Sequence, residues 1–331
     1  MSKGKEFFVG FDLGGTKMMA TVFDASLNKL CSARKKTKAQ EGIKKGLTRM
    51  EDLINECLNG AGISKTELAG IGIGCPGVLD IKRGVLRESA NLGWEDVNLK
   101  AYFSEKFSCY VCTINDVDAG LYGEYKKGAG INYSRIVGVF PGTGIGGACI
   151  IDGIIMMGKK TSCMEIGHIC VAPETGFLCG CGNTGCLETV ASRLAIASQA
   201  AAAAYRGQAP ALLARCGTDI AAIKSKDIAY SISAGDKCVE QIVRNAARWL
   251  GCGISIAVDL LLPDIVIIGG GLVDVLPKFY LDEIYDSALK HVMPSFRKIL
   301  RILPAQLGDD AVTIGAAGWV KQLLQSNNEL N

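Results

Sequence analysis

The stretch IVGVFPGTGIGGACIIDG, residues 136–153, decides between two kinds of α/β fold. It contains Gly142-Thr-Gly-Ile-Gly-Gly147, which matches the G-x-G-x-x-G fingerprint of the Rossmann fold, and Glu165 follows at about the spacing of that fold's acidic residue. In a Rossmann unit these glycines open a helix. Here an apolar run to Ile151, a turn at Asp152-Gly153 and a second apolar run follow instead, and this pattern predicts a β-hairpin.

The composition is that of a globular protein with room for two domains. The chain has 331 residues, of which 49% are hydrophobic and 21% are charged. Its net charge of +3 favours neither a nucleic acid nor a membrane as a partner. The first residues lack the apolar core of a signal peptide, and most of the 14 cysteines stand singly among apolar residues, as reduced core thiols do. We therefore expect a cytoplasmic location.

The order of the predicted elements repeats once along the chain. Strands are expected at residues 7–12, 18–24 and 29–36, then a helix at 42–61 and a strand at 68–75. From residue 135, strands at 135–140, 147–151 and 154–157 are followed by helices, among them 194–205 and 237–261, and by a strand at 264–268. Each half is three hairpin-connected strands, then helix and strand, which predicts two related α/β domains facing a cleft.

Glycine-rich turns follow three of the predicted strands. Glycine lets a ligand approach the backbone closely, and successive N–H groups in such turns can bind an anion. Each turn alone could equally be an ordinary hairpin turn. The three together, one of which carries an aspartate, a threonine and a lysine, favour a nucleotide-phosphate site. The residues are Asp12, Gly14, Gly15, Thr16 and Lys17; Gly142, Thr143 and Gly144; and Gly269, Gly270 and Gly271.

Two further motifs lie between the second and third turns, EIGH at residues 165–168 and CGCGNTGCLE at 179–188. With DLGGTK at 12–17, PGTGIGG at 141–147 and GGG at 269–271, they resemble the motifs of the ROK family (repressors, open reading frames, kinases), and most closely its glucokinase branch. The resemblance covers nearly the whole chain. It implies the actin-like ATPase and sugar-kinase fold, two actin-like/ribonuclease-H-like α/β domains flanking a cleft, in which the glycine turns bind ATP with Mg²⁺.

On this fold we expect the chain to form its two domains from three segments. Residues 1–117 plus 312–331 would form a small N-terminal α/β domain, to which a C-terminal helix at 316–324 returns. Residues 118–311 would form a large α/β domain that carries the cysteine motif. The sugar would bind between the domains, and we expect it to close them about hinges near 116–120 and 304–315.

One histidine and three cysteines form a candidate metal site. His168 lies a short loop before Cys179, Cys181 and Cys186, and one imidazole with three thiolates is the composition of a closed, structural zinc site. The interleaved glycines allow the tight curl that such ligands need. Cys163 and Cys170 are nearby competitors for the same role. The ROK resemblance favours His168, Cys179, Cys181 and Cys186, because the family's structural Zn²⁺ is held at these motif positions.

The pair Asn115-Asp116 ends an apolar strand and precedes a helical pattern at 118–125. Asparagine and aspartate are also preferred helix N-caps, so the pair could have a purely structural role. The ROK resemblance implies instead that Asn115 binds a sugar hydroxyl and that Asp116 is the catalytic base. Such a carboxylate would accept the hydroxyl's proton as the bond to phosphorus forms.

Further polar residues could bind the sugar's other hydroxyls. Glu165, His168 and Glu188 bracket the cysteine motif, and carboxylates and an imidazole suit such hydroxyls. Alternatively, Glu165 could be a surface carboxylate and Glu188 a first-turn helix residue favoured by the helix dipole. Asn91, in SANLGW, resembles the family's other sugar-contacting asparagine and would otherwise be an ordinary turn residue.

The expected activity is ATP-dependent phosphorylation of a hexose, in first place glucose to glucose 6-phosphate. Kinases for fructose, mannose, allose or an N-acetylated amino sugar stay open, as do polyphosphate as donor and a non-catalytic ROK-type sugar sensor. A ROK repressor would carry a DNA-binding domain before the first glycine turn, which we do not expect because Asp12 lies so early. The expected partners are a hexose and ATP, with the chain forming a homodimer or homotetramer.

Overall fold

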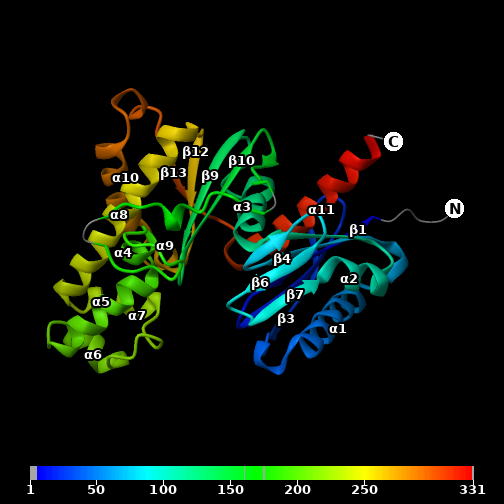
Figure 1. The fold of residues 1–331 in the computed structure, drawn as a ribbon, viewed down its shortest axis with the longest axis horizontal. Coiled ribbons are helices and arrows are strands. Elements are labelled where there is room, and N and C mark those ends of the chain that lie inside the picture. The colour runs from blue at the N-terminus through cyan, green and yellow to red at the C-terminus, as the bar shows by residue number, and fades with distance from the viewer. Residues whose placement is uncertain (1–5, 160, 174–175, 330–331) are drawn as a thin grey trace. The chain divides into compact units, whose positions relative to one another are not determined.

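The computed structural model describes residues 6–159, 161–173 and 176–329, and its contacts divide the chain into two compact units (Figure 1). Unit 1 consists of the described residues of 1–132, 153–163 and 306–331, and unit 2 of those of 133–152 and 164–305. The domain limits expected from the sequence, 1–117 plus 312–331 against 118–311, stay a prediction. No helix in the described part of the chain is long and apolar enough to cross a membrane.

Unit 1 is built on a five-stranded mixed sheet with the order β3-β2-β1-β4-β8. These strands are β1 (Phe7–Leu13), β2 (Lys17–Phe23), β3 (Lys29–Lys36), β4 (Leu68–Cys75) and β8 (Tyr110–Asn115). The helices are α1 (Ile43–Ala61), α2 (Leu99–Phe107), α3 (Asp116–Lys127) and α11 (Ala311–Glu329). A small antiparallel sheet of β5 (Val78–Asp80), β6 (Val85–Ser89) and β7 (Trp94–Asn98), which the sequence did not predict, joins β4 to α2.

Unit 2 repeats this plan with more helices. Its strands β9 (Arg135–Pro141), β10 (Ile145–Ile151), β12 (Ile265–Ile268) and β13 (Ile302–Pro304) have the order β10-β9-β12-β13, and β11 (Ile154–Ile155) follows β10 in the chain. The helices are α4 (Glu188–Ala191), α5 (Arg193–Tyr205), α6 (Pro210–Cys216), α7 (Ser225–Ser233), α8 (Lys237–Leu261), α9 (Gly271–Val275) and α10 (Pro277–His291). Both sheets pair their first two strands antiparallel and the next two parallel, which confirms the predicted repeat.

The opening stretch forms the predicted hairpin. β9 and β10 pair antiparallel, with Pro141 opposite Ile145 across the turn. A strand therefore follows the G-x-G-x-x-G sequence where a Rossmann unit would have a helix, and the Rossmann reading is excluded. The β-branched run Ile150–Ile151 favours this outcome because branched side chains pack well on a pleated surface.

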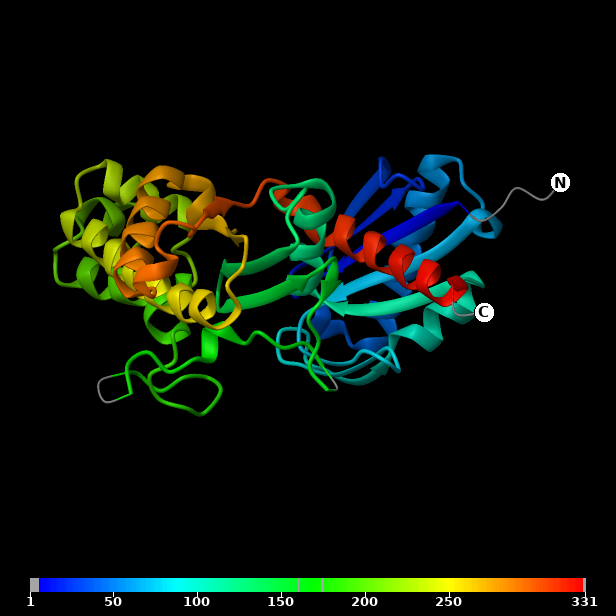
Figure 2. The ribbon, with the colours of Figure 1, turned by 90° about the horizontal axis from the view of Figure 1, so that it is seen from above.

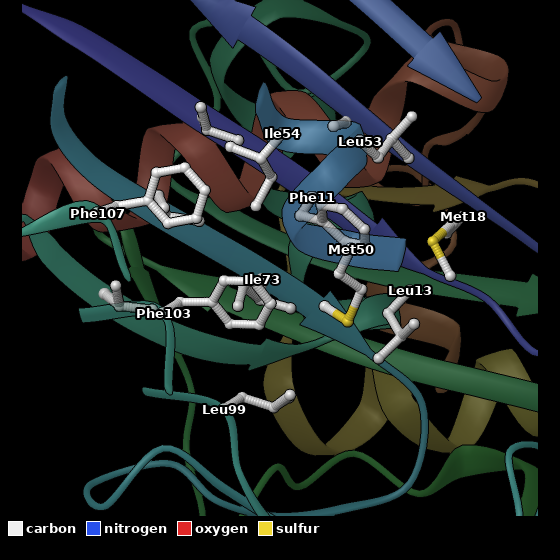
Figure 3. Packing of buried hydrophobic residues seen from close by; sticks show 14 of the residues in the cluster. Phe11, Leu13, Met18, Met50, Leu53, Ile54, Ile73, Leu99, Phe103 and Phe107 are labelled. Carbon is white, nitrogen blue, oxygen red and sulfur yellow. The ribbon is translucent and has the colours of Figure 1, made fainter. Parts of the chain in front are cut away.

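The core of unit 1 lies between its sheet and α1 (Figure 3). Helix α1 buries Met50, Leu53, Ile54, Cys57 and Leu58, the i, i+3, i+4, i+7, i+8 stripe of an amphipathic helix. Against this stripe the sheet presents alternate residues of β1, Phe11 and Leu13 among them. Each such large side chain contributes roughly 1.5–3 kcal/mol on burial, so this contact fixes α1 on the sheet.

The opposite face of the same sheet is covered by α11 at unusually short range (Figure 2). Gly10 of β1 and Gly72 of β4 are register partners. A Cβ on Gly10 would lie 1.8 Å from the carbonyl oxygen of Thr313, and one on Gly72 would lie 1.9 Å from that of Ala316. No side chain fits there, so the helix backbone rests directly on the strand backbones.

Helix α3 packs against α11 in the same way. A Cβ on Gly123 would lie 2.2 Å from the carbonyl oxygen of Ala311, and one on Gly315 would lie 1.7 Å from that of Ala119. The glycines thus bring α3, α11 and the sheet into backbone contact. The position of α3, which begins at Asp116, follows from this packing.

This packing predicts opposite effects for two alanine substitutions in α3. Gly123→Ala should destabilise the protein by about 1–3 kcal/mol because its methyl group overlaps the Ala311 carbonyl. Gly120→Ala meets only a Val312 methyl at 3.9 Å and should stabilise it by about 0.5–1 kcal/mol through helix propensity. Denaturant unfolding of both variants measures the difference. Equal effects would mean that the helices do not pack this closely.

Candidate functional site

Two carboxylates lie at the same edge of the unit 1 sheet. Asp12 is opposite Gly74 in the parallel pair β1–β4, and Gly74 is opposite Ile114 in the parallel pair β4–β8. Asp116 follows two residues after Ile114, as the first residue of α3. The carboxyl ends of parallel strands are where α/β sheets bind ligands, and the register brings Asp12 and Asp116 to that edge together.

Asn115 and Asp116 also cap the helix that they begin. The Asn115 side-chain oxygen accepts hydrogen bonds from the N–H groups of Val117 (2.9 Å) and Asp118 (3.4 Å). Asp116 Oδ1 accepts a further bond from the Val117 N–H at 3.0 Å. Asn115 is therefore the N-cap of α3, as the sequence allowed. These hydrogen bonds orient the side chains of Asn115 and Asp116.

The electrostatics of this edge favour the protonated form of its carboxylates. Partial burial raises the pKa of Asp12 to about 7, with smaller contributions from the charges of Asp116 and Asp309, which Arg34 opposes. Burial also raises the pKa of Asp116, against the hydrogen bond from the Val117 N–H. A cation or a bound hydroxyl would relieve this crowding of negative charge, so the edge is suited to either.

A cavity of about 280 Å³ opens beside Asp12. Lys17 and Arg34 line it together with Asp309, to which the Arg34 guanidinium donates a hydrogen bond of 2.7 Å. Unlike Asp12 and Lys17, Arg34 and Asp309 were not among the residues expected from the sequence. Their pairing joins β3 to the segment before α11, a contact between distant parts of the chain that no local motif could reveal.

The glycine turn after β1 is held from two sides. Thr37, which is buried, donates its hydroxyl to the carbonyl oxygen of Gly14 at 2.6 Å, and its N–H to that of Thr16 at 2.9 Å. On the other side, a Cβ on Gly15 would lie 3.0 Å from the Asn91 carbonyl oxygen. The predicted sugar residue Asn91 therefore lies against the predicted phosphate turn.

In unit 2 the two predicted nucleotide turns are neighbours. The turn after β9 is closed by a hydrogen bond from the Gly142 N–H to the Gly144 carbonyl oxygen at 2.8 Å. The turn after β12 approaches it so closely that a Cβ on Gly270 would lie 2.3 Å from the Pro141 carbonyl oxygen. Gly270 has a φ of 107°, which also favours glycine.

Arg193, the first residue of α5, was not predicted and lies against the turn after β9. Its guanidinium donates a hydrogen bond of 2.9 Å to the Thr143 hydroxyl, and its N–H donates one of 2.9 Å to the Gly142 carbonyl oxygen. A fixed positive charge thus accompanies the glycine turn. The arginine guanidinium is well suited to phosphate oxygens, so the charge of Arg193 is compatible with the predicted phosphate-binding role of this loop.

The predicted metal ligands converge. His168, Cys179, Cys181 and Cys186 place one ligand atom each within 4.8 Å of one another. The Sγ atoms of Cys181 and Cys186 lie 3.7 Å apart, and Cys179 Sγ lies 3.6 Å from His168 Nδ1. In a tetrahedral site with zinc–sulfur bonds of about 2.3 Å, two sulfur ligands lie about 3.8 Å apart. The donor set therefore fits Zn²⁺ in both chemistry and spacing.

The competing cysteines have other contacts. Cys163 Sγ lies 3.1 Å from the Met156 carbonyl oxygen, and Cys170 Sγ lies 3.6 Å from that of Thr184. Neither belongs to the group of four. Gly182 and Gly185 have φ values of 90° and 81°, which supports the expected role of the interleaved glycines in curling the loop.

Glu188 joins the metal cluster to the glycine turn. Its Oε2 accepts a hydrogen bond of 2.8 Å from the Ile145 N–H, and its Oε1 lies 3.9 Å from Cys179 Sγ. A Cβ on Gly144 would lie 2.2 Å from Oε2. Glu188 also begins the short helix α4, which is the structural role that the sequence allowed, and its role in sugar binding stays a prediction.

The EIGH motif packs on β10. A Cβ on Gly167 would lie 2.2 Å from the Ile145 carbonyl oxygen, so the turn Ile166–His168 lies directly on the strand. His168 is half-buried beside the cysteines, and Glu165 is exposed. In unit 2 the structure thus brings together the EIGH motif, the cysteine motif and the turn 142–144.

Comparison with known proteins identifies related chains. The model of the ROK family matches residues 8–323. The glucokinase of Halalkalibacterium halodurans is 32% identical over 96% of this chain and 95% of its own length. A ROK family glucokinase from Streptomyces griseus, solved in complex with glucose and AMPPNP, has 30% identity and a TM-score of 0.81 over 96% of this chain and 99% of its own. The xylose repressor of Caldicellulosiruptor bescii is 27% identical over 86% of this chain and 70% of its own length.

The raised pKa of Asp12 predicts a pH-dependent stability. Between the ordinary carboxyl pKa near 4 and the folded value of about 7, the folded state holds a proton that the unfolded state has lost. Stability therefore falls as pH rises through this window. Asp12→Asn should be more stable than wild type at pH 8 by roughly 1–2 kcal/mol after allowance for solvent screening, and equally stable near pH 4.

Denaturant unfolding of the nucleotide-free protein at both pH values measures this difference. Asp96→Asn is the control, because Asp96 is an exposed carboxylate paired with Arg87 on the surface of the same unit. It should change stability little at either pH. A less stable Asp12→Asn at pH 8 would contradict the assignment.

Proposed function

This chain belongs to the ROK family, and from that premise we propose that it transfers the γ-phosphate of ATP to a hexose, forming glucose 6-phosphate from glucose. The observation that carries the proposal is the placement of Asp116 at the start of α3, on the same sheet edge as Asp12 and its glycine turn. Two comparisons support it. The relatives include glucokinases, and the Streptomyces griseus glucokinase was solved in complex with glucose and AMPPNP.

In this proposal Asp116 is the general base. Its Oδ1 is held by the Val117 N–H, so the carboxylate is oriented and its Oδ2 is the atom assigned to the sugar hydroxyl. Burial raises its pKa, which brings its proton affinity closer to what a base needs near neutral pH. The Asn115 amide, fixed by its capping bonds, would orient the hydroxyl.

The nucleotide would be held by the glycine turns of both units. Asp12, Gly14, Gly15, Thr16 and Lys17 would serve in unit 1, and Gly142, Thr143, Gly144 and Gly269 to Gly271 in unit 2, with Arg193 beside them. Mg²⁺ bound with ATP neutralises phosphate charge, and the crowded carboxylate of Asp12 suits a position near it. These residues would position the phosphates.

The sugar would take its remaining contacts from Asn91, Glu165, His168 and Glu188. Zn²⁺ would be structural here, since His168, Cys179, Cys181 and Cys186 complete a tetrahedron and leave no position for water. With one ring nitrogen on the metal, His168 would keep the other for a hydroxyl or an acceptor. The Glu188 contact to Cys179 would couple the zinc loop to the sugar.

Two other functions remain candidates. A kinase for fructose, mannose, allose or an N-acetylated amino sugar would use the same residues, because one hydroxyl's orientation separates these substrates. A non-catalytic sugar sensor is suggested by the related xylose repressor, but a sensor would not need the base Asp116. A coupled assay over a panel of hexoses, with ATP or polyphosphate as donor, separates these functions. We also propose a cytoplasmic homodimer or homotetramer.

Substitution of the base should abolish turnover and spare binding. Asp116→Asn should lower kcat at least ~10²-fold, because the amide cannot accept the hydroxyl proton. Sugar affinity, measured by calorimetry, should stay near the wild-type value. Asp24→Asn, in an exposed turn of the same unit, serves as control. Near-normal kcat in a folded Asp116→Asn protein would leave Asp116 with its capping role alone.

Zinc should copurify with the protein at about one ion per chain, as one closed set of four ligands requires. Cys181→Ala should lose both the metal and sugar affinity, because the loop that carries His168 and Glu188 is no longer held together. Cys170→Ala, in the same loop but outside the four, should keep both. Active wild-type enzyme without zinc would refute the metal assignment.

A further inference from the structure

Two free thiols of unit 1 lie where its sheet meets α1. Cys31 is on β3, the edge strand of the sheet, and Cys57 is on the buried stripe of α1. Neither belongs to the group of four metal ligands, and neither takes part in the proposed reaction. Their placement between strand and helix therefore calls for a separate explanation.

The side chain of Cys31 is on the face of β3 that α1 covers. On the same strand, Lys35 pairs with Glu56 of α1 at 2.7 Å, and Ala33 packs against the hydrophobic core. Cys31 shares the face of these residues because alternate residues of a strand point the same way. A Cβ on Gly60, in the last turn of α1, would lie 2.7 Å from the Cys31 Sγ. The sulfur thus occupies the space that a side chain there would take.

Cys57 approaches the same part of β3 from the helix. It is fully buried, and its Sγ lies 3.2 Å from the carbonyl oxygen of Ala20, which is the register partner of Ala33. Cys31 is two residues before Ala33 on the same face of the strand. Gly60, which contacts the Cys31 sulfur, is one helical turn after Cys57. The two thiols are therefore neighbours, and a hydrogen bond joins them.

The two thiols differ in exposure. Cys31 is half-buried on an edge strand, where a small reagent can reach it, whereas Cys57 is enclosed in the core. Burial is the main cause that raises the pKa of Cys57 to about 12, and the charge of Cys31 and the hydrogen bond between the thiols add to it. Cys31 is thus suited to react with a reagent from solvent, and Cys57 to react with Cys31 alone.

We propose that Cys31 and Cys57 form a modification site that reacts with a low-molecular-weight disulfide and closes into an intramolecular disulfide between β3 and α1. The Cys31 thiolate attacks one sulfur of the reagent, whose S–S bond breaks and releases the first thiolate. The Cys57 sulfur then attacks Cys31 Sγ and releases the second. Each leaving thiolate takes up one of the two protons that the protein thiols lose. The protein is oxidised, and the reagent is reduced to two thiols.

The first step prepares the second. Once its sulfur is bonded to the reagent, Cys31 carries no charge, so one cause of the raised pKa of Cys57 is removed. The hydrogen bond from the Ala33 N–H, which lowers that pKa, remains to stabilise the attacking thiolate. In a reducing compartment such a bond is transient, so the link between β3 and α1 would respond to the redox state. This inference does not depend on the proposed function.

Peptide mapping of the full-length, folded protein tests the site. The protein is incubated with oxidised glutathione in a buffer containing Zn²⁺, and the remaining thiols are alkylated before digestion with trypsin. Cleavage after Lys and Arg places Cys31 in the peptide 30–34 and Cys57 in the peptide 50–65, each with a single cysteine. We expect a disulfide between these two peptides, which dithiothreitol reverses. Recovery of both as alkylated thiols, or of Cys31 only as its glutathione adduct, would overturn the proposal.

Three variants separate the two steps. Cys57→Ala should lose the crosslink and accumulate the glutathione adduct on Cys31, because no second thiol releases it. Cys31→Ser should lose both products, and a glutathione adduct on Cys57 in that variant would contradict the assigned order. Cys252→Ala is the matched control, since it removes a half-buried thiol of α8 outside the pair. It should form the 31–57 crosslink as fully as wild type does.

Thermal unfolding gives a second readout. Oxidation should raise the melting temperature of the wild-type protein by about 5–10 °C, because the bond restrains β3 and α1 in the unfolded chain. Cys31→Ser, treated in the same way, should show no such rise. Equal rises in the two proteins would assign the effect to other thiols and overturn the role of the pair. None of these measurements requires kinase activity, so they decide the site even if the proposed function is refuted.

Discussion

Unit 1 depends on backbone contact that only glycine permits. Where Gly10 and Gly72 stand side by side on β1 and β4, the carbonyl groups of α11 lie within 2 Å of where side chains would begin. Gly123 and Gly315 extend the same contact to α3. The first residue of α3 is thereby set at the sheet edge that carries Asp12, where burial, with a smaller contribution from the charge of Asp116, raises the pKa of Asp12.

Much of the fold could be predicted from local sequence. The strand at 29–36, the strand at 68–75 and the helix at 237–261 form with the predicted bounds. The last two of these elements have strong periodicity or clear glycine and proline boundaries. The sheet β5–β7 was missed because its strands are only three to five residues long, too short for a clear alternation of apolar and polar residues.

The candidate site divides in the same way. Motif residues such as Cys179 and Cys186 converge as their spacing suggested, because one short loop holds them. Arg193 carried no local signal, since its guanidinium donates to the Thr143 hydroxyl, 50 residues away in the sequence. The double role of Glu188, which supports the 142–144 turn and contacts the cysteine loop, likewise becomes visible only in three dimensions.

The covering of β1 and β4 by α11 has a consequence for synthesis on the ribosome. The strands of the first sheet, which end by Asn115, leave the ribosome well before α11 at Ala311–Glu329, the helix that covers one face of that sheet. Until then Gly10 and Gly72 present bare backbone and apolar neighbours to the surroundings. The ribosome adds about 5–20 residues per second. Until α11 is made, one face of the sheet of unit 1 therefore stays uncovered and is accessible to chaperones.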